Sequence, residues 1–199
     1  MFLARRPSQR EIEEFIARSR DLPLSYEPIG IAKESPNGFK VDEASGVIGR
    51  GEQGFAQAKL ALADWRHFDF GWVELFPRGA AVEPGSVVAV FVHHLGFWSL
   101  NGCRVVYTLG DRRTSLSFGF AYGTLTNHAE SGEEIFEVSL APESEEVVYR
   151  IRAVSKPRAT MARIGYPLTR MLQARFRRDS IIAMRNAIES RSPSGRGPG

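Results

Sequence analysis

The chain has 199 residues, of which 43% are hydrophobic and 25% charged, and these ordinary globular values exclude a disordered protein. Its longest apolar stretch, Val87 to Val92, is far shorter than the roughly 20 residues that a membrane-spanning helix needs. The net charge of +3 is uneven, because residues 156–199 hold ten Lys or Arg and only two acidic residues. We expect this local basic charge to bear on association with anions, not on the fold.

The cysteine content and the N-terminus indicate the cellular compartment. The chain has one cysteine, Cys103, which excludes an internal disulfide framework and a zinc site built from several cysteines. Arg5 and Arg6 are followed by Pro, Ser, Gln and Arg, where a secretory signal would have its apolar segment. We therefore expect no export, and a cytoplasmic protein in a reducing compartment.

The N-terminal quarter predicts one helix and a run of turns. Ser8 followed three residues later by Glu11 is a capping-box pattern, and the apolar residues after it recur at helical spacing. The helix should end near Asp21, because the proline that follows disfavours helical geometry in the residue before it. Glycine and proline over residues 36–51 predict turns around one short strand at residues 39–41.

A second helix is predicted over residues 52–65, whose apolar residues follow steps of three and four. Gly49, Arg50 and Gly51 precede it. A glycine-rich turn before a helix can bind phosphate through free backbone N–H groups. This segment lacks the glycine spacing and the Lys-Ser/Thr pair of a P-loop, so we favour a tight turn at the helix start.

From residue 71 to 154 the apolar pattern changes to a period of two, with turn residues at intervals typical of antiparallel strands. In the strand ending at Tyr122, the even-numbered residues from 116 onward are large and apolar or aromatic, and the odd-numbered ones are small. Alternate residues of a strand face opposite sides, so one face should be aromatic. The predicted strands are 72–76, 87–95, 104–109, 114–122, 134–140 and 147–154.

The C-terminal part predicts a long amphipathic helix after Pro157, with apolar residues from Met161 and Ile164 onward at helical spacing and arginines between them. Pro167 either starts its main segment or kinks it. Residues 192–199 hold no apolar residue and predict a flexible tail. Residues 1–191 are therefore expected to form one α+β domain.

An antiparallel sheet with one apolar face must be covered, and the terminal helix is the element long and apolar enough to cover it. This arrangement resembles the helix-grip fold of START and Bet v 1-like proteins, in which a curved antiparallel β-sheet wraps around a long C-terminal α-helix and an internal cavity. The alternative is a closed or nearly closed β-barrel with external helices.

Four motifs lie along the folded part of the chain. They are Gly49-Arg50-Gly51 with Phe55 and Ala58; Trp65-Arg66-His67-Phe68 with Trp72; Trp98-Ser99-Leu100-Asn101 with Cys103-Arg104-Val105-Val106-Tyr107; and Phe120-Ala121-Tyr122-Gly123-Thr124-Leu125 with His128, Glu130, Gly132, Glu133, Glu134 and Phe136. On these motifs the chain resembles uncharacterised protein family 0548, a domain-of-unknown-function family of bacteria and plants. Asn127 departs from the proline or glycine expected there, which affects only the loop conformation. The resemblance implies no activity.

The segment 123–134 predicts a loop between two strands that carries His128 and three carboxylates within seven residues. His128 could act as a general base, with Glu130 or Glu134 as its partner, or the group could bind a metal. We favour a structural role, in which Gly123 and Gly132 form a turn.

In that structural role the carboxylates accept bonds from backbone N–H groups or pair with Arg104, Arg150 or Arg152. No metal site is expected, because the loop has no second histidine. His93 and His94 do not supply one together, since neighbours on a strand face opposite sides.

Seven aromatic, basic or histidine side chains are candidate ligand-binding residues, although the aromatic ones could equally form a filled core. Cys103 is expected to be buried filler. The candidates are Trp65, Trp72, Trp98, Arg104, Tyr107, Tyr122 and His128.

Three functions remain open from the sequence. The first, which we favour, is a binding module for a small hydrophobic or amphipathic ligand in a cavity between the sheet and the C-terminal helix, without a cofactor. The second is an enzyme on the same scaffold with His128 and Glu134 as acid and base. The third is association with an anionic membrane or with nucleic acid through the Arg-rich terminal helix. We favour a simpler interpretation of these arginines, as the solvated side of an amphipathic helix.

Overall fold

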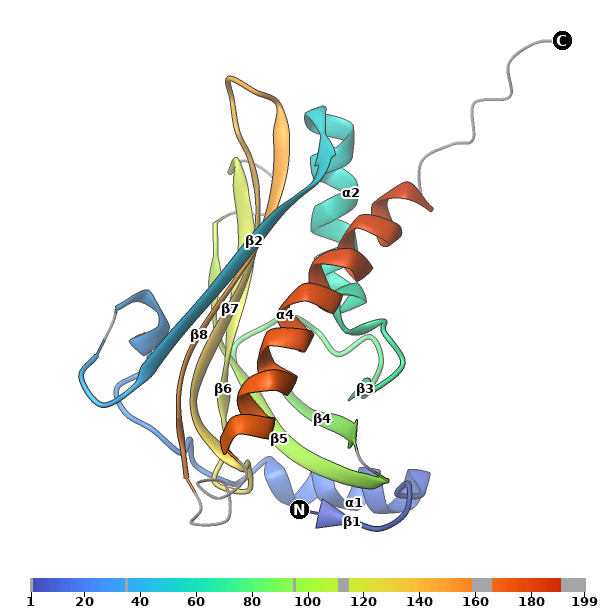
Figure 1. The fold of residues 1–199 in the computed structure, drawn as a ribbon, viewed down its shortest axis with the longest axis vertical. Coiled ribbons are helices and arrows are strands. Elements are labelled where there is room, and N and C mark those ends of the chain that lie inside the picture. The colour runs from blue at the N-terminus through green and yellow to red at the C-terminus, as the bar shows by residue number, and fades with distance from the viewer. Residues whose placement is uncertain (1, 35, 95, 111–114, 159–165, 191–199) are drawn as a thin grey trace, which may run out of the picture.

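A curved antiparallel sheet and the long helix across it make up most of the structure (Figure 1). The structure is a computed structural model that describes residues 2–34, 36–94, 96–110, 115–158 and 166–190. Its elements are β1 (Phe2–Leu3), α1 (Gln9–Ser19), η1 (Ile31–Lys33), β2 (Lys40–Arg50), α2 (Gly51–Ala63), η2 (Arg66–Phe68), β3 (Val73–Phe76), β4 (Val87–His94), β5 (Phe97–Leu109), β6 (Ser117–Thr124), β7 (Glu130–Leu140), β8 (Glu146–Pro157) and α4 (Tyr166–Glu189).

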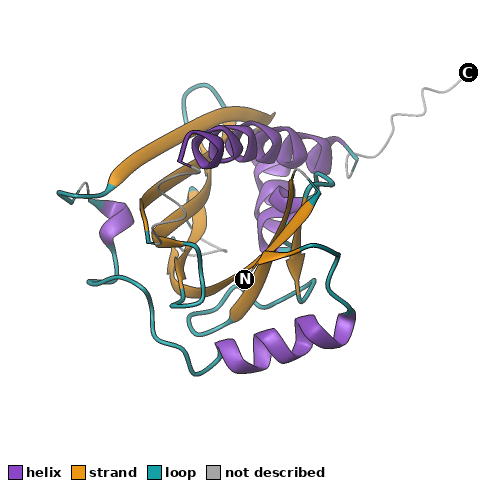
Figure 2. Cartoon of the chain, turned by 60° about the horizontal axis from the view of Figure 1, so that its bottom comes forward, coloured by secondary structure: helices purple, strands orange, loops and turns teal. Residues whose placement is uncertain are grey.

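The strand order is β2-β8-β7-β6-β5-β4-β3, with β1 paired to β5, and neighbouring strands are antiparallel. Within the described part of the chain, the edge strands β2 and β3 do not pair with each other, so the sheet stays open. The sheet curves around α4, which packs against β2, β8, α2 and η2 (Figure 2). The helix-grip prediction is therefore confirmed, and the β-barrel alternative is wrong because α4 lies inside the curve.

The two faces of the sheet have different covers, as the alternation in β6 predicted. Phe118, Phe120 and Tyr122 join the main core on the concave face, which α2 and α4 cover. Ala121 belongs to a second cluster on the convex face, together with Tyr26 from the N-terminal segment. Farther along that face, α1 packs against β4. Each face of the sheet thus excludes water over part of its area.

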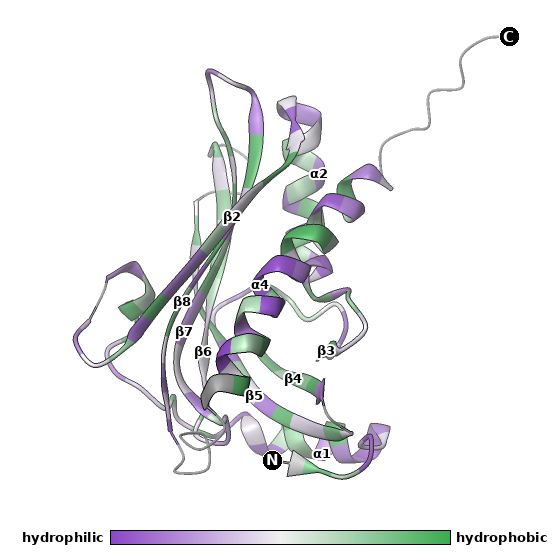
Figure 3. Cartoon of the chain, in the orientation of Figure 1, coloured by the Kyte–Doolittle hydropathy of each residue, from purple (hydrophilic) through white to green (hydrophobic). Residues whose placement is uncertain are grey.

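Hydrophilic and hydrophobic residues alternate along the whole of α4 (Figure 3), but its two halves differ in how they pack. Its second half is packed solidly, with Ala183, Met184, Ala187 and Ile188 buried against the core. In its first half, the residues that face the sheet stay partly accessible, among them Leu172, Gln173, Phe176 and Arg177. The concave side of the molecule therefore has a filled half and a hollow half.

Several predicted elements are confirmed. Helix α1 has its capping box, in which Ser8 and Glu11 bond each other's backbone N–H groups, and α2 begins one residue before the prediction. Pro167 lies in the first turn of α4, where its missing N–H costs no bond, so it starts the helix. Gly51 has a positive φ of 67° and donates its N–H to the carbonyl of Glu145, so the tight-turn interpretation is also confirmed.

Two predictions about strand lengths are wrong. The region predicted as turns around residues 39–41 contains the 11-residue strand β2. Its Gly46 leaves space for α4, because a Cβ there would lie 2.8 Å from Ile181 Cγ2. Strand β5 begins at Phe97, seven residues before the predicted start. In β2, the glycine serves close packing and not chain reversal.

The predicted tail at residues 192–199 lies outside the described residues, as do Met161, Ile164 and part of the turn after Gly110. Among the helices that the structure describes, none combines the length and the apolar character needed to cross a membrane.

A histidine sits in the centre of the aromatic core. His67 is completely buried, with its ring 4.5 Å from that of Phe136 and 4.7 Å from that of Phe68, centroid to centroid. Neither ring nitrogen has a hydrogen-bond partner among the described residues. Burial lowers the pKa of His67 from its ordinary 6.5 to about 3, so the ring is neutral in the folded protein at pH 7.

This burial predicts an acid-sensitive fold. Between about pH 6.5 and pH 3 the unfolded chain binds a proton at His67 that the folded chain does not, so stability falls as the pH falls. By pH 4.5 the loss from this residue should reach about 2–3 kcal/mol. Urea unfolding at several pH values measures it, and His67→Phe should flatten the slope. The exposed His93, changed to Phe, serves as the control, and an unchanged slope in His67→Phe would contradict the prediction.

Candidate functional site

The hollow half of the concave face contains a partly open cavity of about 220 Å³ between the sheet and the first half of α4. Strands β3 to β8, the loop before β7 and the helix all contribute side chains. Its apolar wall consists of Trp72, Val73, Val90, Val92, Leu172 and Phe176, and its polar side chains include Asn101, Tyr122, His128, Glu130, Glu134, Gln173 and Arg177.

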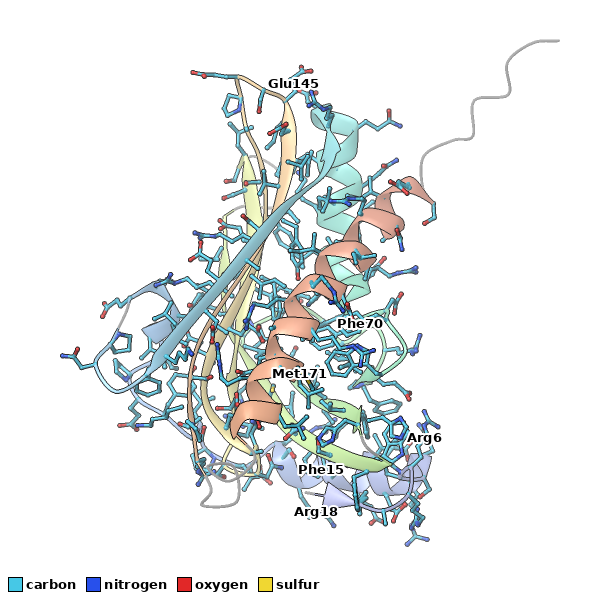
Figure 4. The ribbon with its side chains drawn as sticks, in the orientation of Figure 1. Arg6, Phe15, Arg18, Phe70, Glu145 and Met171 are labelled. Carbon is cyan, nitrogen blue, oxygen red and sulfur yellow. The ribbon has the colours of Figure 1, made fainter. Side chains whose placement is uncertain are left out.

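Two aromatic residues of the apolar wall, Trp72 and Phe176, both pack against the ring of Phe70. Phe70, which lies beside α4 in Figure 4, has its ring centroid 5.5 Å from that of Phe176 on the helix. Trp72 donates its indole N–H to the Asp179 carboxylate of α4 at 2.9 Å, and Arg175 covers the ring at 4.6 Å. The helix therefore fixes the orientation of Trp72 at the cavity edge.

The strand register brings polar residues of the concave face into one row. Tyr122 pairs with Glu134, Glu134 with Ala153, and Ala153 with Asp42, on four neighbouring strands from β6 to β2. Directly paired side chains on one face lie about 5 Å apart at Cβ. Two carboxylates, on either side of a small alanine, thus lie beneath the first half of α4.

Glu134 is the central ionisable group of this row. The Tyr122 hydroxyl donates to its Oε2 at 2.9 Å, which is the one hydrogen bond to this carboxyl group from the described residues. Burial is the main cause that raises the pKa of Glu134; the hydrogen bond from Tyr122 and the charge of Arg177 lower it, the charges of Glu130 and Asp42 raise it, and the net pKa is about 7. Near pH 7 the carboxyl group can therefore both donate and accept a proton.

Glu130 provides a second carboxylate in the cavity. Gln173 of α4 places its amide nitrogen 2.8 and 2.7 Å from the two Glu130 oxygens. Burial raises the pKa of Glu130, although the bonds from Gln173 and Ser155 favour its charged form. No ion pair of Glu130 or Glu134 with a described residue is present within 4 Å.

The arginines nearest to these carboxylates are engaged by Asp42. Arg170 forms a two-pronged ion pair with Asp42, and Arg177 lies 3.6 Å from the same carboxylate. The hydrogen bonds from Arg170 hold the pKa of Asp42 below its usual range. These pairs tie the first half of α4 to the edge strand β2.

Two histidines reach the cavity without forming a catalytic pair with a carboxylate. His128 accepts a hydrogen bond at Nδ1 from the backbone N–H of Glu130 at 2.9 Å. Burial lowers the pKa of His128 to about 4, so the ring is neutral at pH 7. His94 also lines the cavity, and its buried Nδ1 has no partner among the described residues. His93 lies on the other side, where its ring stacks on Trp98.

The structure divides the seven candidate ligand-binding residues into two groups. Trp72, Tyr122 and His128 line the cavity. The other four have partners elsewhere: Trp65 donates to the carbonyl of Ala80 in the core, Trp98 packs with α1, Arg104 donates to the carbonyls of Arg20 and Leu22, and Tyr107 donates to Glu133. Burial of Cys103 in the core is confirmed.

The predicted loop 123–134 is largely strand. Strand β6 runs to Thr124 and β7 begins at Glu130, so only residues 125–129 connect them. Gly123 and Gly132 are not turn residues. A Cβ at Gly123 would clash with the Tyr26 hydroxyl, and one at Gly132 would clash with the carbonyl of Val154. Both glycines therefore permit close packing.

The expected partners of the three carboxylates are also corrected. Glu133 is buried and accepts bonds from the Tyr26 and Tyr107 hydroxyls and from the backbone N–H groups of Gly30 and Ala32, which confirms its structural role. The arginines proposed for it and its neighbours bond elsewhere, since Arg150 and Arg152 pair with Glu43 on β2.

Sequence reasoning placed the cavity between the sheet and the terminal helix but named none of the α4 side chains that line it. Thr169, Leu172, Gln173, Phe176 and Arg177 line it, at spacings of three, one, three and one that place them on one helix face. Arg177 was assigned to the solvated side, but its side chain is only 12% exposed. The sequence signal for this placement was that Arg177 lies next to Phe176, on the helix face whose other residues point towards the sheet.

No group of three or more His, Cys, Asp or Glu side chains in the described part of the chain is arranged to hold a metal ion.

Comparisons with known proteins identify the family. A UPF0548 protein of Dictyostelium discoideum is 31% identical over 96% of this chain and 97% of its own length. A UPF0548 protein of Arabidopsis thaliana is 28% identical over 90% and 93%. Among solved structures, the di-domain ARO/CYC StfQ from the steffimycin biosynthetic pathway is similar in fold, with a TM-score of 0.54 at 11% identity, over 77% of this chain and 52% of that one. Residues 25–183 match the domain of unknown function DUF1990, and the chain belongs to this family.

Proposed function

We propose that the protein binds a small amphipathic ligand in the cavity between the sheet and α4. The observation that carries the proposal is the cavity itself, a partly open space of about 220 Å³ with an apolar wall and several polar side chains. An apolar cavity of about 150 Å³ is sufficient for benzene, whereas pockets for drug-sized ligands start near 300 Å³. The ligand should therefore be about the size of one substituted ring.

The lining supports a ligand with two chemical ends. Trp72, Leu172 and Phe176 offer apolar contact, and burial of an apolar ring against them supplies most of the affinity. Tyr122 and His128 provide hydrogen-bonding groups that orient the polar end. We also propose a cytoplasmic location, since the single thiol, Cys103, is buried and forms no disulfide.

Native mass spectrometry of protein purified from its own host tests the proposal, by comparing gentle with denaturing conditions. Ala153→Leu places a larger side chain in the cavity beside Glu134. The wild type should release a reproducible small molecule, and Ala153→Leu should lose at least about 90% of it because the space is filled. The matched control is Ala174→Leu at an exposed position of α4. A molecule retained fully by Ala153→Leu would place binding elsewhere.

An enzyme on the same scaffold is the second candidate, and the pKa of Glu134 near 7 favours it. A group that titrates near the working pH is suited to general acid–base catalysis. His128 and Glu134 line the same cavity, but their hydrogen bonds go to Glu130 and Tyr122 respectively. Glu134 alone would therefore exchange the proton with the ligand.

Glu134→Gln distinguishes turnover from binding, since the amide keeps the shape of the carboxyl group and cannot transfer its proton. Under the enzyme candidate, this variant retains the unconverted molecule, so it and the wild type release different masses in the same experiment. Glu137→Gln, whose carboxylate pairs with Arg150, should behave as the wild type. Identical masses from all three proteins would contradict turnover.

Association through the arginines of α4 is less supported. Arg170 and Arg177 pair with Asp42, Arg175 and Arg178 pair with Asp179, and Arg185 donates to the carbonyl of Val47. These intramolecular partners reduce the charge that the helix presents to a phosphate surface.

A further inference from the structure

Among the described residues, the guanidinium groups that contact the cavity carboxylates and their partners do not balance the carboxylate charges. The row beneath α4 and its immediate partners contain three carboxylates, Asp42, Glu130 and Glu134, and two guanidinium groups, Arg170 and Arg177. Both guanidinium groups contact Asp42, and neither forms an ion pair with Glu130 or Glu134. With every group ionised, this set carries one negative charge more than positive charges.

The unbalanced charge lies on the cavity side of the set. Glu130 has its oxygens bonded by the neutral amide of Gln173, and Glu134 is bonded by the neutral hydroxyl of Tyr122. His128 does not supply the missing charge, because its Nδ1 accepts a hydrogen bond from the backbone and its pKa lies near 4. Glu130 and Glu134 are partly buried, and a carboxylate that loses much of its water without gaining a cation is costly, so it either takes up a proton or attracts a positive ligand.

We propose that the ligand of this cavity carries one protonated amine, which sits against the carboxylates of Glu134 and Glu130. One positive charge brings the set to neutrality, and the N–H donors of an ammonium group match acceptors that the protein leaves open. The aromatic rings of Trp72, Tyr122 and Phe176 line the same space and tolerate a cation against their faces. This inference rests on the proposed function and specifies its ligand class.

The cavity volume limits the rest of the ligand. Scaling from a benzene-binding cavity of about 150 Å³, a volume of about 220 Å³ accommodates roughly nine non-hydrogen atoms. An amine on a single ring or on a short branched alkyl chain fits this limit. Its apolar part would contact Leu172 and Phe176 of α4, and its nitrogen would point towards β7.

Titration with matched probes tests the inference. Benzylamine and benzyl alcohol have nearly the same shape and differ in charge, and binding of each is measured by calorimetry and NMR at about pH 8, where Glu134 is mostly ionised. The wild type should bind benzylamine at least about tenfold more tightly than benzyl alcohol. Glu134→Gln should lose this preference, while its affinity for benzyl alcohol stays within about twofold, which also shows that the variant is folded.

Lowering the pH provides an independent readout. Protonation of Glu134 at about pH 5 should weaken benzylamine by at least about tenfold and leave benzyl alcohol unchanged, and near pH 7 benzylamine should release protons into the buffer. Glu137→Gln, on the other face of β7, is the matched control. Ala153→Leu should block both probes, which places them in the cavity.

The failures of the two proposals are distinguishable. Equal affinity of the wild type for the two probes, with both blocked by Ala153→Leu, overturns the amine inference and leaves ligand binding in the cavity intact. An amine preference that persists in Glu134→Gln also overturns it. If neither probe binds, the amine inference is overturned. The proposed function is overturned by a different result, in which Ala153→Leu still retains the bound host molecule.

Discussion

The position of α4 across the concave face is the constraint on which the remaining structure depends. Its second half is held by burial, with Met184 and Ile188 among the core side chains, and loss of either side chain would cost a few kcal/mol. Its first half is held differently, by the ion pairs of Arg170 and Arg177 with Asp42 on the edge strand. Because the first half is tied by charges at its side, it does not need to fill the space beneath it.

The ionic attachment and the cavity are physically linked. A helix that packed apolar side chains along its whole length would close the gap and leave no room for a ligand. Asp42, Glu134 and Tyr122 lie on one row of the sheet, so the same register that anchors the helix also places a carboxyl group of raised pKa in the cavity. Holding Glu134 in this environment costs free energy, and the packing of the other half of the domain offsets that cost.

Much of the architecture was predictable from the sequence. The period-two pattern in β6, the capping box of α1 and the proline at the start of α4 each have a local cause, so each could be inferred from neighbouring residues. The helix-grip arrangement followed, because one apolar sheet face required one long cover. The glycines were misleading, since Gly46 and Gly132 relieve contacts with residues distant in sequence.

The cavity was only partly predictable for a related reason. Trp72, Tyr122 and His128 could be proposed from residue type, but their separation from Trp98 and Tyr107 depends on which face each residue occupies. The pairing of Tyr122 with Glu134, and of both with the Asp42 row, depends on strand register, which one sequence does not determine. Gln173 and Arg177 were hidden in a helix whose polar residues all resembled solvent-facing ones.

The division of α4 into a packed half and a hollow half separates stability from selectivity. Residues such as Leu172 and Ala153 border empty space, so a change in their size alters the cavity and removes few contacts from the core. Mutations there can be accepted one at a time without unfolding the domain, whereas changes around Met184 cannot. The shape of the cavity could therefore diverge among descendants of one ancestral chain while the helix and the sheet stay the same.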